Sequence, residues 1–259
     1  MNRKQIAVVT GAHSGLGKEF VKLLTEDGTI SEIWAIARNK EKLDQLISEF
    51  GNRVRVFSLD LSDRTSFSVI EKLFLEERIH ITYLINNAGY AKFCSYDDIT
   101  VDESLNMIDL NVSAVVALGL ICIPYMKKGS HIINIASQAS FFPLPYQNIY
   151  SSTKAFVSNY TRALNVELKN KGITAIAVCP GWMKTGLFDR GTIGADRATN
   201  NFSGMVTPDV VAAKALSDAK KGKDISIYGL PVKLTWLFSK VTPPKLMMRI
   251  WLMQQGIKP

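Results

Sequence analysis

Hydrophobic positions along this chain alternate between short continuous runs and longer helical patterns. The short runs are rich in β-branched residues, as expected of strands buried on both faces, and they lie at residues 5–11, 32–38, 53–60, 81–89, 131–137 and 173–181. The helical patterns lie between them, at residues 15–27, 39–50, 63–77, 102–128 and 148–171. Strands and helices that alternate at this spacing predict right-handed βαβ units. We therefore expect a single α/β domain whose doubly wound parallel sheet is flanked by helices on both faces.

The regular alternation ends after Gly181. Residues 182–208 are rich in Gly, Asn, Thr and Asp and predict a long irregular segment. Such segments in compact domains are usually functional, so we expect a substrate lid over residues 187–207. Residues 230–259 form two apolar, basic helical segments that are separated by Pro243-Pro244. The predicted organisation is a domain over residues 1–229, which includes the lid, and a C-terminal helical extension over residues 230–259.

Composition favours a cytoplasmic protein with one large core. The chain has 259 residues, of which 47% are hydrophobic. Cys94, Cys122 and Cys179 have no metal-ligand or redox spacing, so we expect no metal site and a reducing compartment. The apolar run at the N-terminus is too short for a signal peptide. The longest apolar stretch, residues 112–126, is shorter than a bilayer span and predicts a buried helix.

Positive charge is concentrated near the C-terminus. The chain carries a net charge of +8, and residues 211–259 hold nine basic and two acidic residues. The basic, apolar extension has three possible roles: it lies on a membrane surface, packs on a neighbouring subunit, or covers the substrate pocket. Packing on the domain or on a partner subunit is favoured over membrane contact, and we expect a homodimer or homotetramer. No nucleic-acid recognition module is recognisable, so we expect no nucleic-acid partner.

The first predicted strand runs into a glycine-rich turn. Gly11, Gly15 and Gly17 follow the spacing G-x-x-x-G-x-G, which differs from the common G-x-G-x-x-G fingerprint. Glycines at this place allow a tight turn and a close approach of the backbone to a pyrophosphate, and the helix that follows supplies free amides. The turn therefore predicts a dinucleotide site.

The residues after the second and third predicted strands indicate which dinucleotide binds. The second strand is followed by Arg38, Asn39 and Lys40, with no carboxylate to bind a ribose 2′-hydroxyl. Because a guanidinium pairs with a 2′-phosphate, NADP(H) is favoured over NAD(H). The alternative is that Arg38 only begins an exposed helix. Asp60, at the end of the third strand, either receives the adenine amino group or is a turn residue.

Six motifs occur together in a fixed order. They are Thr10-Gly11-x-x-x-Gly15-x-Gly17, Asn86-Asn87-Ala88-Gly89, Asn111, Ser137, Tyr150-x-x-x-Lys154 and Pro180-Gly181-x-x-x-Thr185. A tyrosine and a lysine four apart occur by chance in many helices, but here the pair follows Ser137 by thirteen residues. From about residue 5 to 190 the chain resembles the single-domain, NADP(H)-preferring branch of the short-chain dehydrogenase/reductases. The resemblance implies a Rossmann-type fold and an oxidoreductase that acts on CH–OH groups with NADP(H).

The same resemblance implies a role for each motif residue. Tyr150 is expected to be the general acid/base, Ser137 to hold the substrate oxygen, and Asn111 to anchor a water of the proton relay. Lys154 is expected to lower the pKa of the tyrosine and to bind the nicotinamide ribose. The serine that precedes Ser137 in many relatives is Ala136 here. The expected cofactor-binding residues are Gly11, His13, Ser14, Gly15, Leu16, Gly17, Arg38, Asp60, Leu61, Asn87, Ala88, Gly89, Tyr150, Lys154, Pro180, Gly181, Met183 and Thr185.

The expected substrate pocket is bulky and apolar. Ala139, Tyr146 and Trp182 are the predicted substrate residues, within or beside the segment SFFPLPY and the pair Trp182-Met183. Such walls favour a hydrophobic ketone or secondary alcohol, with a steroid, bile-acid-like or other lipid ketone as the first candidate. The alternatives are that these aromatic residues are ordinary packing, or that the enzyme reduces small carbonyl metabolites or acyl-chain ketones. A catalytically silent, cofactor-sensing regulatory protein on the same fold is the remaining alternative.

Overall fold

A parallel β-sheet forms the centre of the protein. The computed structural model describes residues 3–186, 191, 201–202 and 204–257. Its sheet has the strand order β3-β2-β1-β4-β5-β6-β7, with every neighbouring pair parallel. The strands are β1 (Lys4–Thr10), β2 (Glu32–Ala37), β3 (Val54–Ser58), β4 (Ile79–Asn86), β5 (His131–Ile135), β6 (Thr174–Val178) and β7 (Ile225–Ser226). The predicted Rossmann-type, doubly wound fold is confirmed.

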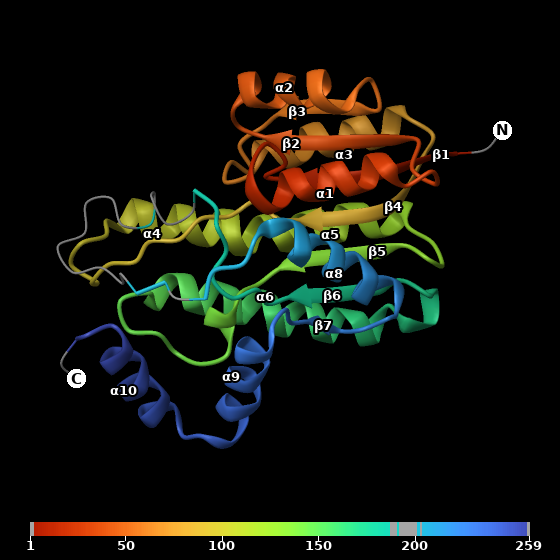
Figure 1. Cartoon of the computed structure of the whole chain (residues 1–259). Helices are drawn as coiled ribbons and strands as arrows, with labels where there is room; N and C mark the ends of the chain where they lie inside the picture. Colours follow the sequence, from red (N-terminus) through yellow and green to blue (C-terminus); the bar gives the residue numbers. More distant parts are fainter. Residues whose placement is uncertain (1–2, 187–190, 192–200, 203, 258–259) are drawn as a thin grey trace.

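Helices cover both faces of this sheet because its strands are apolar on both sides. Ala7 and Val9 of β1 pack into a core cluster with one helix layer, and Ile6 and Val8 pack into a cluster with the other. The first layer contains α1 (Gly15–Glu26), α2 (Lys40–Phe50) and α8 (Pro208–Lys220). The second contains α3 (Thr65–Glu76), α5 (Ala114–Cys122) and α6 (Asn148–Glu167). Figure 1 shows α1 and α8 on the near side of the sheet and α5 on the far side.

The long helix predicted over residues 102–128 runs without interruption over residues 101–125, but its helix type changes within it. It consists of α4 (Val101–Ile108), a π-helical turn over Asp109–Ser113, and α5. By length and composition alone, Val101–Tyr125 could cross a membrane. However, 44% of its most apolar window is buried inside the protein, where Leu118 packs with the sheet. It is therefore a core helix of the second layer.

Two elements of the C-terminal part were not predicted. Strand β7 has only two residues, which is too short for an alternation pattern. Helix α8 carries a buried acid, Asp218, on its inner face, so its apolar periodicity is broken. Of the lid predicted over residues 187–207, only residues 191, 201–202 and 204–207 are described.

The C-terminal extension forms the two helices that the sequence predicts. They are α9 (Leu230–Val241) and α10 (Pro244–Gln254); Thr242 and Pro243 lie between them, and Pro244 is the first residue of α10. In Figure 1 they lie below β7 and outside the helix layers of the sheet.

The buried carboxylate of Asp218 joins α8 to β7. It accepts hydrogen bonds from Lys214 Nζ at 2.7 Å, Lys223 Nζ at 2.8 Å and Ser226 Oγ at 2.8 Å. Burial by itself raises the pKa of Asp218, but these three hydrogen bonds outweigh it and hold the pKa at about 2. The ionised carboxylate therefore stabilises this edge of the sheet.

We predict that Asp218→Asn lowers the free energy of unfolding at pH 7 by about 2 kcal/mol, because a pKa unit corresponds to about 1.4 kcal/mol. The folded pKa of about 2 lies below the ordinary value of 3.8, so this contribution is complete above about pH 4 and is lost as the pH falls through 2. Urea unfolding at several pH values measures the difference. Asp44→Asn, at a side chain that is 52% exposed, is the control. A deficit of equal size at pH 7 and pH 2.5 would contradict the assignment.

Candidate active site

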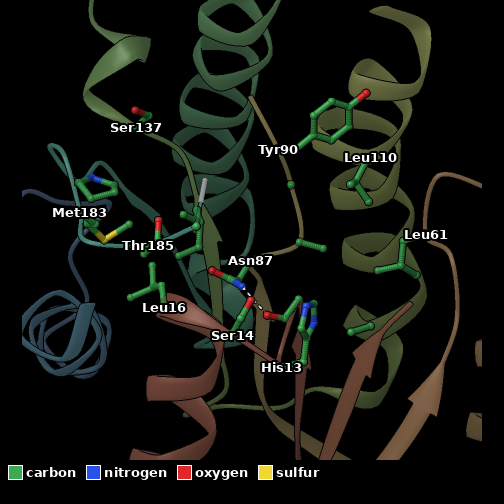
Figure 2. A pocket seen from close by; sticks show the side chains of 18 of the residues that line it. His13, Ser14, Leu16, Leu61, Asn87, Tyr90, Leu110, Ser137, Met183 and Thr185 are labelled. Atoms are coloured by element: carbon green, nitrogen blue, oxygen red, sulfur yellow. Dashed lines mark hydrogen bonds between the residues drawn. The ribbon is translucent and has the colours of Figure 1, made fainter. Parts of the chain in front are cut away.

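A cavity of about 330 Å³ opens where the strands of the sheet end. It lies at the point where the strand order reverses, between β1 and β4, which is where sheets of this kind bind ligands. Most predicted site residues line it: Gly11, His13, Ser14, Gly15, Leu16, Arg38, Asp60, Leu61, Asn87, Ala88, Gly89, Ser137, Tyr150, Lys154, Pro180, Gly181, Trp182, Met183 and Thr185. The predicted residues that do not line it are Gly17, Asn111, Ala139 and Tyr146. Figure 2 shows the cavity from close by.

The glycine-rich turn needs glycine for two different reasons. Gly11 and Gly15 have φ values of 61° and 52°, in the left-handed region that side chains disfavour. Gly17 has an ordinary φ, but a Cβ there would lie 2.2 Å from the carbonyl oxygen of Gly11. The first turn of α1 therefore packs directly on the loop before it. This close packing leaves the backbone at the cavity wall without side chains, as the approach of a pyrophosphate requires.

Asn87 and Thr10 fix this turn to the end of β4. The amide of Asn87 donates to the carbonyl oxygens of Thr10 at 3.0 Å and of Gly11 at 3.1 Å. In return, the Thr10 hydroxyl accepts from the backbone N–H groups of Asn87 at 3.0 Å and Ala88 at 2.9 Å. Figure 2 shows Asn87 beside the turn, with His13 and Ser14 at the same end of the cavity. The ends of β1 and β4 thus form one rigid wall.

Cations gather at the other end of this wall, after β2. Arg38 Nη1 lies 3.6 Å from Asp60 Oδ2, and Asp60 also accepts from the backbone N–H of Ser62 at 3.0 Å and its hydroxyl at 2.7 Å. Burial raises the pKa of Asp60, but the bonds from Ser62 and the charge of Arg38 outweigh it and hold the pKa below the ordinary value. Lys42, in the first turn of α2, also lines the cavity and was not predicted. Its signal in the sequence was the run of cations that begins at Arg38.

Ser137, Tyr150 and Lys154 meet at the opposite end of the cavity from Arg38. Ser137 follows β5, and its hydroxyl accepts a hydrogen bond from the backbone N–H of Ala139 at 3.1 Å. Tyr150 and Lys154 lie one turn apart on α6, both buried, and Lys154 Nζ is 5.8 Å from the centre of the tyrosine ring. The ammonium donates to the carbonyl oxygen of Ile135 at 2.8 Å. The spacing of the motif thus brings the three side chains together.

The predicted lowering of the pKa of Tyr150 by Lys154 stays a prediction, and burial of the tyrosine acts against it. Burial raises the pKa of Tyr150 to about 12, against the opposing effect of the Ser137 hydrogen bond. Burial likewise lowers the pKa of Lys154 to about 8. The physical reason is that both groups are desolvated, which disfavours the phenolate and the ammonium alike. Near pH 7 the structure therefore holds a neutral phenol beside an ammonium.

Asn111 lies behind the cavity and not in its wall. Its side-chain oxygen accepts from the backbone N–H of Tyr90 at 3.1 Å, and its amide donates to the carbonyl oxygen of Tyr90 at 2.9 Å and to Thr153 Oγ1 at 3.2 Å. A Cβ at Gly89 would lie 2.8 Å from Asn111 Oδ1. The side chain is therefore committed to the segment after β4, which it fixes against α6. The role of anchoring a water stays a prediction.

The predicted substrate residues lie at different depths. Trp182 lines the cavity, whereas Ala139 is buried in an aromatic and aliphatic cluster that also contains Tyr150. Tyr146 is half-buried and has a φ of 63°, which is rare for a residue with a side chain. The segment that begins at Tyr90 was also expected in the pocket wall, and Tyr90 does line the cavity. The cavity residues that were not predicted are Ile36, Ala37, Lys42, Leu59, Leu110, Ile135, Ala136 and Gly186. Figure 2 shows Tyr90 and Leu110 on one side of the cavity and Ser137 and Met183 on the other.

Aromatic rings surround the end of the cavity that holds Tyr150. The Phe93 ring lies edge-on to the rings of Tyr150 and Trp182, with centroid distances of 6.0 and 6.2 Å. Phe202 lies 5.0 Å from Trp182, and Trp251 of α10 lies 6.4 Å from the same ring. Trp251 Nε1 also donates to the carbonyl oxygen of Pro145 at 3.0 Å. The C-terminal helix α10 thus supports the apolar end of the site.

Comparison with known proteins agrees with this geometry. The sequence model described as short chain dehydrogenase matches residues 5–192. A Staphylococcus epidermidis protein named an uncharacterized oxidoreductase is 30% identical over 185 residues, which cover 71% of this chain and 80% of that protein.

Solved structures of similar fold cover nearly the whole chain. A short-chain dehydrogenase from Sphingobium yanoikuyae in complex with NADPH is 28% identical, with a TM-score of 0.78, and the match covers 94% of this chain and 95% of the other. A bulky-bulky ketone specific alcohol dehydrogenase from Comamonas testosteroni is 26% identical, with a TM-score of 0.75, and the match covers 93% of each chain.

We predict that Gly17→Ala lowers the free energy of unfolding by about 1–3 kcal/mol, because a Cβ so close to a backbone oxygen forces the turn or α1 to shift. Gly28→Ala is the control, since a Cβ at Gly28 has no neighbour within 4 Å. Urea unfolding measures both variants. Equal stability of the two variants would contradict the close packing of the turn.

Proposed function

The chain belongs to the short chain dehydrogenase family, and from that premise we propose that it is an NADP(H)-dependent reductase of hydrophobic ketones. The observation that supports this most strongly is the meeting of Ser137, Tyr150 and Lys154 at one end of the cavity. The glycine-rich turn and Arg38 line the same cavity. A cofactor that extends between the two ends would bring its reactive ring to the phenol of Tyr150.

The raised pKa of Tyr150 suits the role of proton donor in ketone reduction. The cofactor, when bound, supplies or accepts the hydride. A phenol whose pKa is raised to about 12 keeps its proton near neutral pH and can donate it to the oxygen of a ketone as an alkoxide forms. Ser137 would hold the same oxygen through its hydroxyl, and Lys154, with a pKa of about 8, remains an ammonium at pH 7. Oxidation of an alcohol would instead need the phenolate, which burial disfavours.

The residues present fit NADP(H) as the cofactor. Arg38 and Lys42 line the end of the cavity after β2 and offer two cations to a 2′-phosphate. Asp60 holds Arg38 through its ion pair, so that the guanidinium is already positioned. The presence of NADPH in the Sphingobium relative supports the same choice.

A bulky, apolar ketone fits the end of the cavity near Tyr150. Trp182 lines the cavity there, and the rings of Phe93 and Phe202 pack against Trp182. The Comamonas relative, named for bulky-bulky ketones, supports a large substrate. We propose a steroid, bile-acid-like or other lipid ketone as its class. The homo-oligomer and the cytoplasmic location expected from the sequence remain predictions.

We predict that Tyr150→Phe lowers NADPH-dependent turnover of a hydrophobic ketone by at least 10²-fold, since a general acid typically contributes about 10²–10⁴-fold. The dissociation constant of NADPH should change by less than about twofold, because the ring remains in place. A panel of hydrophobic ketones and a fluorescence titration of NADPH measure the two effects. Tyr160→Phe, on the same helix, is the matched control and should keep its activity. Substantial reductase activity in Tyr150→Phe would exclude the assigned role.

We predict that Arg38→Ala weakens NADPH binding by more than about tenfold and leaves NADH binding nearly unchanged, because only NADPH carries the 2′-phosphate. Lys42→Ala should show the same selectivity with a smaller effect. Lys40→Ala is the control, since Lys40 is a neighbouring exposed cation that is absent from the cavity wall. Titrations with both cofactors measure the ratio. If Arg38→Ala weakens both cofactors equally, the 2′-phosphate role is wrong.

A further inference from the structure

Helix α9 carries an apolar stripe that faces solvent. The stripe consists of Leu230, Leu234, Leu237, Phe238 and Val241, whose exposed fractions range from 50% to 81%. These positions are spaced i, i+4, i+7, i+8 and i+11, which places them on one face of the helix. They include most of the large hydrophobic side chains of α9. The stripe is therefore a contiguous apolar patch, unlike the single exposed apolar residues that are common on protein surfaces.

The opposite face of α9 already has its packing partner. Val232 and Trp236 pack against the core cluster that contains Ile227 and Val157. A Cβ at Gly181 would lie 2.8 Å from Val232 Cγ2, so α9 is in close contact with the segment after β6. The helix therefore has two apolar faces, and the domain covers only the inner one.

Cations without carboxylate partners lie beside the stripe. Residues 230–259 contain five basic residues and no acidic ones. Lys233 and Lys240, both exposed, lie one heptad apart, and the helical spacing places them along one border of the stripe. Lys245 and Arg249 are exposed on α10. Within the described residues, none of the ion pairs involves these four cations.

We propose that this stripe docks on the surface of an anionic lipid bilayer. An apolar face bordered by lysines is complementary to acyl chains beneath negatively charged headgroups. A two-fold contact of the stripe with itself would instead bring the cations of two copies together, with no carboxylate in the segment to offset them. With 12 residues at about 1.5 Å each, α9 is far shorter than the roughly 30 Å hydrocarbon core, and Pro243 and Pro244 interrupt it before α10. It therefore lies on the bilayer and does not cross it.

The docking surface is connected to the proposed substrate end of the site. In Figure 1, α9 leads through the turn at the bottom of the view into α10. The far end of α10 contributes Trp251, which packs beside Trp182 of the cavity wall. A lipid ketone that leaves the bilayer would meet this aromatic end first. Docking itself does not depend on the proposed reaction and is measured without cofactor or ketone.

Vesicle sedimentation of the full chain tests the proposal. The probes are vesicles of phosphatidylcholine alone and of phosphatidylcholine mixed with phosphatidylserine. The protein should sediment with the mixed vesicles, and binding should fall as salt is added, because salt screens the attraction. The double variant Leu234→Gln with Phe238→Gln should lower the partition of the protein onto the mixed vesicles by at least about tenfold. The reason is that it loses two apolar side chains that would be buried in the bilayer. Lys233→Gln should lower it by about fivefold for the mixed vesicles only.

Matched controls separate docking from general surface effects. Leu75→Gln removes an apolar side chain of α3 that is 79% exposed, and Lys72→Gln removes an exposed cation of the same helix; both should sediment as the unmodified protein does. If the double variant fails to fold, vesicle sedimentation of Lys233→Gln, a substitution at an exposed side chain, still tests the proposal. Absence of sedimentation with the mixed vesicles overturns the proposal, as does sedimentation of the variants at the unmodified level. A smaller oligomer of the double variant in sedimentation velocity, without vesicle binding by the unmodified protein, would show a subunit contact instead.

Discussion

The close approach of the first turn of α1 to the loop before it is the constraint on which the site depends. Gly17 leaves room for the Gly11 carbonyl, and Asn87 holds that carbonyl from the end of β4. Thr10 completes the contact from β1. Because β1 and β4 are the central pair of the sheet, any shift of this turn would move the cavity wall relative to α6, which carries Tyr150. A few hydrogen bonds thus link the glycine-rich turn to the cavity wall that Tyr150 shares.

The central part of the fold was predictable because its signals are local. Six of the strands are continuous apolar runs, and their parallel order follows from the helices between them. The edge of the sheet was not predictable in the same way. Asp218 looks like an exposed acid in the sequence, yet Lys214, Lys223 and Ser226 surround it once α8 and β7 are in place. The π-helical turn at Asn111 likewise depends on contacts with Tyr90 and Thr153, which the helical pattern alone does not indicate.

In the site, too, the sequence predicts what depends on motif spacing and misses what depends on packing between distant segments. The order and spacing of the motifs correctly predicted that Ser137, Tyr150 and the glycine-rich turn line one cavity. They could not tell that Ala139 is buried behind the wall, because that depends on rings from α10 and the segment after β6. Nor could they find Lys42, whose place in the cavity depends on the position of the first turn of α2 beside Arg38.

Burial rather than spacing sets the charge state of the tyrosine and lysine pair. A separation of one helical turn suggests that the ammonium lowers the pKa of the phenol, but desolvation opposes the charged form of both groups. The Lys154 ammonium also donates a hydrogen bond to the carbonyl oxygen of Ile135. The polypeptide therefore favours the neutral phenol, the form that donates a proton. The aromatic rings at this end of the cavity, including Trp182 and the Trp251 of α10, add to the same apolar environment. The surroundings that keep the phenol neutral are thus built by segments as far apart in the sequence as β5, the segment after β6 and α10.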